Sequence, residues 1–108
     1  MNLLNLTPHA IVLVDLDGNI TTIQPSGIVA RVSTIDTKTG DFNGIPVYSR
    51  TFGDVQGLPT DGTPCIVSSM VLAAIPAGTP GVYAPDTGST AIRNDAGHIL
   101  AVTRLIAA

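Results

Sequence analysis

Glycine and proline interrupt this chain so often that it has little room for a long helix. The 108 residues include 11 glycines and 8 prolines, and many of them separate short runs rich in Val, Ile and Thr. Such runs, bounded by turn-forming residues, are typical of β-strands. Glutamate is absent and lysine occurs once, so the residues that usually cover exposed helices are nearly missing. The sequence therefore predicts a mainly β fold.

The length predicts one domain, residues 1–108, because about 100–150 residues is the usual size of a domain with one core. We expect a mainly β (α+β) architecture, built as a small antiparallel sheet or a barrel-like domain with one short buried helix near residues 68–75.

Two hairpins are predicted from turn signals. Residues 10–15 and 19–24 flank Asp17-Gly18 with β-branched side chains, which is typical of a two-residue hairpin turn. Near the end of the chain, residues 90–93 and 99–106 flank a turn in which Gly97 suits a left-handed backbone conformation. Both hairpins are antiparallel, so they agree with the predicted fold class.

The middle of the chain predicts further strands and the single helix. Alternation favours a strand over 28–35, a surface loop or hairpin tip over 36–44, and a strand over 45–52. The sheet resumes at Cys65, beside Ile66 and Val67. A helix of about two turns begins near Ser68 or Ser69 and ends before Pro76. Since that helix is apolar on nearly all sides, we expect it to be buried against the sheet or a neighbouring subunit.

Charged residues are scarce, at 12% against a usual value of about 25%. A small domain with few charges and 44% apolar residues readily buries a subunit interface, so a homo-oligomer is expected; the alternative is a monomer solvated by Thr, Ser and Asn. A net charge of −3 argues against binding to duplex nucleic acid. No apolar run approaches the roughly 18 residues of a membrane span, and no signal peptide is recognisable. A soluble cytoplasmic protein is expected.

The sequence offers little for catalysis. Cys65 is a single cysteine in an apolar strand, which favours a small buried hydrophobe over a nucleophile. With one cysteine, two distant histidines and no glutamate, we expect no metal and no cofactor. Asp86-Thr87-Gly88 is also the tripeptide of aspartic proteases, but the residues after it depart from the protease pattern. The chain is therefore predicted not to be an enzyme.

Several sequence blocks resemble a family of short bacteriophage and prophage proteins. The resemblance covers most of the chain and rests on Asn5-Leu6-Thr7-Pro8-His9, Ser26-Gly27, Gly57-Leu58-Pro59, Ile66-Val67-Ser68 and Arg93-Asn94-Asp95-Ala96-Gly97. The family has no settled activity, so the resemblance implies a phage origin and the cytoplasm of an infected bacterial host. Small phage proteins of this kind include virion components and inhibitors of host immunity, among them oligomers that sequester nucleotide signals.

A nucleotide signal would need cations and amides for phosphates, hydroxyls for ribose and an apolar or aromatic shelf for the base. Candidate residues for these roles are Arg93, the loop Asp86, Thr87, Gly88, Ser89 and Thr90, a second polar cluster of Thr7 and His9, and Arg31 and Tyr83. The predicted function is a phage anti-defence protein that binds a cyclic nucleotide or cyclic ADP-ribose derivative without cleaving it. The alternative is a protein–protein interaction module, either an inhibitor of a host defence protein or a virion-associated protein.

Each candidate also has a structural interpretation that the sequence leaves open. Arg93 can pair with Asp95 at the hairpin end, and Asp86-Thr87-Gly88 can be an Asx turn between two strands. Arg31 can form an interface salt bridge, His9 can face solvent or bind a carbonyl group, and Tyr83 can be a core or interface residue.

Overall fold

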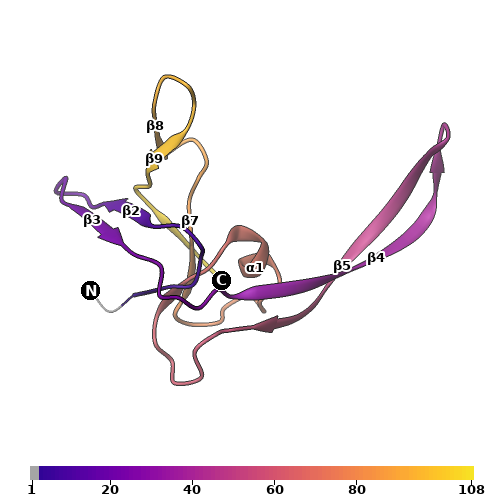
Figure 1. Cartoon of the computed structure of the whole chain (residues 1–108), viewed down its shortest axis with the longest axis horizontal. Helices are drawn as coiled ribbons and strands as arrows, with labels where there is room; N and C mark the ends of the chain where they lie inside the picture. Colours follow the sequence, from indigo (N-terminus) through magenta and orange to yellow (C-terminus); the bar gives the residue numbers. More distant parts are fainter. Residues whose placement is uncertain (1–2) are drawn as a thin grey trace.

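The structure is a computed structural model that describes residues 3–108. It is 47% strand and 5% helix, which confirms the β-rich α+β class. A small central sheet lies near the middle, and three hairpins extend from it in different directions (Figure 1). They are β2–β3 (residues 11–23), β4–β5 (residues 31–56) and β8–β9 (residues 92–101). The described strands form several separate sheets and do not close into a barrel.

The central sheet has four strands in the order β1-β6-β7-β10. They are β1 (Leu4–Asn5), β6 (Cys65–Ile66), β7 (Val82–Pro85) and β10 (Leu105–Ala107). β1, β6 and β7 run parallel, and β10 runs antiparallel to β7. The sheet is therefore mixed. β6 and β7 can be parallel because the chain between them crosses over through a helix, as parallel neighbours require.

The predicted helix is present as α1 (Ser69–Ala73). The hydroxyl of Ser68 caps it by accepting a hydrogen bond from the Val71 amide at 3.3 Å. Burial is one-sided, since Val71 is buried but Met70 is 50% exposed. α1 contacts β7 and β4, so it covers one side of the core and leaves its outer side uncovered in the single chain.

The core is small and gathers around the central sheet and α1. Its buried cluster comprises Leu6, Ala30, Cys65, Val67, Val71, Ile75 and Val82. Cys65 lies in a fully buried strand as predicted. Burial also raises the pKa of the Cys65 thiol, which disfavours the thiolate and fits the role of a packed small side chain.

The first predicted hairpin is confirmed as β2 (Ile11–Val14) and β3 (Ile20–Ile23). Its turn is longer than the predicted Asp17-Gly18 pair, because the Asp15 amide donates to the Asn19 carbonyl at 3.0 Å and leaves residues 16–18 between them. The Asp15 carboxylate accepts backbone hydrogen bonds from Asp17 and Asn19 across the turn, each at 2.9 Å. Gly18 has a φ of +81°, a conformation that glycine adopts at little cost.

The central hairpin is much longer than predicted. β4 (Arg31–Phe42) and β5 (Ile45–Gln56) have 12 residues each. The expected loop or hairpin tip over 36–44 is therefore a tip at residues 43–44 only, and residues 36–42 are strand. The turn consists of Asn43 and Gly44, with φ values of +49° and +83°, as in a two-residue Asn-Gly turn. A run of polar residues and a glycine made 36–41 resemble a loop. In the strand the charged residues Asp36, Lys38 and Asp41 share one face, Asp41 because of a register shift between Lys38 and Gly40.

The terminal hairpin is confirmed only near its turn. β8 (Ile92–Arg93) pairs with β9 (Ile99–Ala101), and Gly97 has the predicted left-handed conformation with a φ of +83°. The expected strand over 99–106 is wrong, because the chain leaves the hairpin after Ala101 and then pairs with β7 as β10. Val102 instead exchanges backbone hydrogen bonds with β2, to the amide of Val14 and the carbonyl of Val12.

Candidate functional site

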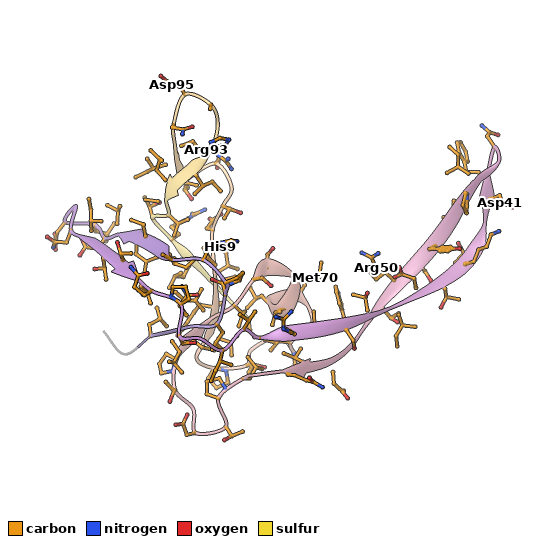
Figure 2. The ribbon with its side chains drawn as sticks, in the orientation of Figure 1. His9, Asp41, Arg50, Met70, Arg93 and Asp95 are labelled. Atoms are coloured by element: carbon orange, nitrogen blue, oxygen red, sulfur yellow. The ribbon has the colours of Figure 1, made fainter. Side chains whose placement is uncertain are left out.

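A groove of about 350 Å³ brings several predicted site residues together. It forms where the segment after β1, the start of α1 and the end of β7 meet. Its lining is Thr7, Pro8, His9, Ile11, Ser68, Ser69, Pro85 and Thr87. Thus Thr87 shares one surface with Thr7 and His9, which are far from it in sequence. Figure 2 shows His9 in the middle of the molecule, with the hairpin of Arg93 above it in this view.

Asn5 holds the N-terminal wall of this groove. Its side chain is 1% exposed. The Asn5 amide donates to the carbonyl oxygens of His9 at 2.7 Å and Ile23 at 2.9 Å, while Asn5 Oδ1 accepts from the Thr7 amide at 3.0 Å. A fully bonded buried amide fixes the local backbone. Sequence reasoning missed this role, although an asparagine flanked by Leu4 and Leu6 before a Thr-Pro turn was a usable signal.

Thr7 lines the groove, but its hydroxyl group is already hydrogen-bonded within the protein. It is 7% exposed, and its Oγ1 lies 2.6 Å from Asn5 Oδ1 and 2.9 Å from the His9 carbonyl oxygen. Its proton therefore has acceptors within the protein. His9 itself is exposed, and its backbone carbonyl makes these hydrogen bonds, so the imidazole ring can meet a ligand.

The loop that follows β7 is an Asx turn. Asp86 Oδ1 accepts from the Gly88 amide at 3.0 Å, and Asp86 Oδ2 pairs with Arg104 Nη2 at 2.7 Å. Thr90 Oγ1 lies 3.3 Å from the same Oδ2. The Gly88 amide and the Arg104 guanidinium hold the pKa of Asp86 below its ordinary value. The carboxylate is thus engaged within the protein, and its charge does not favour an incoming phosphate.

The guanidinium of Arg93 ties the Asx-turn loop to the β8–β9 hairpin. Its Nη1 donates to the Gly97 carbonyl at 2.8 Å and its Nη2 donates to the Thr87 carbonyl at 2.7 Å. The expected partner Asp95 is not among its contacts. Arg93 is not itself part of the groove lining, but it binds the backbone of Thr87, which is. A guanidinium has five N–H donors, and two are accounted for by these bonds.

The remaining predicted residues lie elsewhere or play other parts. Ser89 is exposed in the turn. Arg31 begins β4 and lines a separate hollow of about 320 Å³ with Val32, Ser33, Asp54 and Gln56. Tyr83 is half-buried within β7, in register with Ile66 and Ala107. Of the ten predicted site residues, only Thr7, His9 and Thr87 line the groove, so the structure does not unite all the candidates in one protomer.

Comparison with known proteins adds no assignment. No protein-family model matches the chain, and no similar curated protein or solved structure was found. Across residues 3–108, no cluster of three or more His, Cys or Asp side chains is arranged to hold a metal ion. None of the helices in the same range is long and apolar enough to cross a membrane.

Proposed function

We propose that this chain is a binding protein that holds a small nucleotide-type molecule in the groove beside His9 and Thr87. In keeping with the phage resemblance, the molecule is a host immune signal, a cyclic nucleotide or a cyclic ADP-ribose derivative, and the protein acts by sequestering it. The observation that carries the proposal is the meeting of three distant chain segments at one mainly apolar groove that also carries hydroxyl groups. Ligand sites commonly combine an apolar lining with a few convergent polar groups.

The groove offers a group for each part of a nucleotide. Pro8, Ile11 and Pro85 provide an apolar surface for a base. The hydroxyl groups of Ser68, Ser69 and Thr87 match a ribose, although that of Ser68 also caps α1. Outside this lining, Arg93 is bound to the Thr87 carbonyl and keeps further N–H groups for a phosphate that extends beyond the groove.

Sequestration rather than cleavage is supported by the side chains that line the groove. His9 is the single titratable residue in this lining. General acid–base hydrolysis is most effective with two groups of different protonation state at the reacting centre. The aspartate of Asp86-Thr87-Gly88 forms a salt bridge with Arg104.

Native mass spectrometry against cyclic dinucleotides, cyclic oligonucleotides and cyclic ADP-ribose derivatives tests this proposal. We expect one of them to remain bound at fixed stoichiometry and to be recovered unchanged after heating. Thr87→Val should weaken that binding about fivefold to tenfold, since one hydrogen bond is worth about 1 kcal/mol. Thr22→Val, on an exposed strand away from the groove, is the matched control and should bind normally. Absence of any bound nucleotide would refute the proposal, and a chemically altered ligand would indicate an enzyme.

A second candidate is a protein–protein interaction module, which inhibits a host defence protein or belongs to the virion. The observation in its favour is the row of exposed apolar side chains on the β4–β5 hairpin. A pull-down from infected cells tests it directly, because this function requires a stable macromolecular complex and no retained small molecule.

A further inference from the structure

The β4–β5 hairpin, residues 31–56, forms an arm that reaches away from the rest of the protein (Figure 1). Its base is anchored, because Val32 and Val55 pack against the core cluster. Between residues 33 and 52 every side chain is exposed. An isolated two-stranded hairpin is at best marginally stable in water. An arm of this length therefore needs a further surface to pack against.

The strand register gives the arm two chemically different faces. Residues opposite one another in an antiparallel pair share a face. One face carries the pairs Asp36–Arg50 and Lys38–Tyr48, together with Asp41. The salt bridges Arg50–Asp36 at 2.8 Å and Lys38–Asp41 at 3.4 Å lie on this charged face. Figure 2 labels Arg50 partway along the arm and Asp41 near its tip.

The opposite face carries no charge between residues 35 and 51. Its side chains, in the order of the paired strands, are Ile35 with Thr51, Thr37 with Ser49, Gly40 with Val47, and Phe42 with Ile45. The four large apolar residues among them, Ile35, Phe42, Ile45 and Val47, are between 42% and 68% exposed. The apolar side chains gather at the tip, and the pair Thr37 and Ser49 separates them from Ile35. An exposed uncharged strip with several large apolar side chains is typical of a macromolecular contact site.

The chain exposes more surface than a monomeric protein of its mass, by about the area that a permanent interface would bury. A monomeric globular protein of 11.1 kDa exposes about 5,700 Å². This chain exposes 7225 Å², an excess of about 1,500 Å². Obligate homodimers bury about 1,000–2,500 Å² on each protomer. The radius of gyration is likewise 16.4 Å, against about 13 Å expected for this length.

Charge favours a second copy over a partner of opposite charge. Residues 31–56 contain three cations, Arg31, Lys38 and Arg50, and three anions, Asp36, Asp41 and Asp54. The arm is thus neutral, while the whole chain has a net charge of −3. An uncharged, apolar face is complementary to itself, which is what a two-fold symmetric interface requires.

From these observations we propose that the uncharged face of the β4–β5 arm packs against the same face of a second copy, so that the protein is a dimer or a higher assembly of such dimers. The interface is independent of the ligand groove, since none of the groove residues belongs to the arm. Packing two such ribbons face to face, about 10 Å apart, buries the apolar strip of each.

Sedimentation velocity on the full chain tests the proposal with two neighbouring substitutions. Val47→Asp places a carboxylate on the uncharged face, and Tyr48→Asp places one on the charged face beside Lys38. We expect the wild type and Tyr48→Asp to sediment as the same oligomer. Val47→Asp should weaken association at least about 100-fold, because it buries an unpaired charge, and should sediment at 11.1 kDa at low micromolar concentration.

A folding control keeps the result interpretable. Cys65 lies in the core, away from the arm, so protection of its thiol reports whether each variant has kept its folded body. A wild-type chain that sediments at 11.1 kDa at every concentration overturns the proposal. So does a Val47→Asp variant that keeps its Cys65 protected and its oligomer intact, or a Tyr48→Asp variant that dissociates as readily.

Discussion

Removing the side chain of Asn5, which is buried, should destabilise this protein more than removing any surface or half-buried polar side chain. Asn5 is buried and joins three parts of the chain: its own strand β1, the turn at Thr7 and His9, and the end of β3 at Ile23. Asn5→Ala leaves the Thr7 amide without this acceptor and the Ile23 carbonyl without this donor. Both groups were desolvated by the packing that Asn5 holds together.

The expected magnitude follows from the number of hydrogen bonds. A net value of about 1 kcal/mol for each of the three bonds to backbone groups gives a loss of about 3 kcal/mol. The Thr7 hydroxyl adds little to this sum, because the His9 carbonyl remains within 2.9 Å as an alternative acceptor. Since small domains are stable by about 5–15 kcal/mol, Asn5→Ala should remove a large share of the folding free energy.

Urea unfolding followed by circular dichroism measures the effect. Thr7→Val is the matched comparison, because it removes one neighbouring hydroxyl, keeps the side-chain shape and should cost about 1 kcal/mol. All variants must be compared at one protomer concentration, since association adds to apparent stability. If Asn5→Ala lost no more stability than Thr7→Val, with unchanged m-values, the assignment of Asn5 as the structural centre of this segment would be wrong.

Three further predictions address other parts of the fold. Gly57→Ala should destabilise the protein by about 1–2 kcal/mol or more, because Gly57 has a φ of +91° and an added Cβ would lie 3.1 Å from the Val29 carbonyl oxygen. Gly62→Ala is the control, since Gly62 has a φ of +81° but open space around it, and it should lose less stability in the same urea titration. The Cys65 thiol should react with a thiol reagent only at the rate of opening or unfolding, and rapid reaction in native buffer would contradict its burial. Asp86 has a lowered pKa in the folded protein, so its contribution to stability is present above the unfolded pKa of about 3.9 and is lost as pH falls through the folded pKa. Thermal unfolding between pH 5 and 2 should therefore show a shallower loss of stability for Asp86→Asn than for the wild type.

Local turn chemistry made part of the fold predictable. Asp17-Gly18 and the turn ending at Gly97 specify hairpins through backbone conformations that favour glycine. Likewise, Ser68 before an apolar run and Pro76 after it determine where α1 begins and stops. These features depend on interactions over a few residues, which is why they can be predicted without knowing the rest of the chain.

The length of β4 was not predicted, although its signal was present. Asn43-Gly44 is a strong hairpin signal, yet Asp36, Lys38 and Asp41 made the preceding residues look like a loop. Whether such a stretch is a strand depends on its partner across the ribbon, and the pairing of β4 with β5 supplies it. Asp36 and Lys38 follow the two-residue period of a strand, but Asp41 reaches the same face only through the register shift between Lys38 and Gly40, which the sequence does not show.

The candidate site was predictable as a set of residues and not as an arrangement. The sequence indicated Thr7, His9 and Thr87, but nothing local shows that residues 7 and 87 line one groove. The parallel pairing of β1, β6 and β7 brings them together. The roles of Arg93 and Asp86 were left open between ligand contact and turn formation, and in the structure both bind groups of the protein.

By itself, the sequence determined the β-rich class, the position of the short helix, the burial of Cys65 and two of the hairpin turns. Composition and turn residues determine these features through interactions between residues near one another in the sequence, without a contact from a distant segment. The tertiary structure alone decided that Asn5 is a buried hydrogen-bonding centre, that Arg93 ties the loop at Thr87 to a hairpin, and that β10 leaves β9 to join β7. These outcomes depend on contacts between residues far apart in the chain, and which of several possible partners a polar side chain or strand edge meets is set only when the whole chain packs.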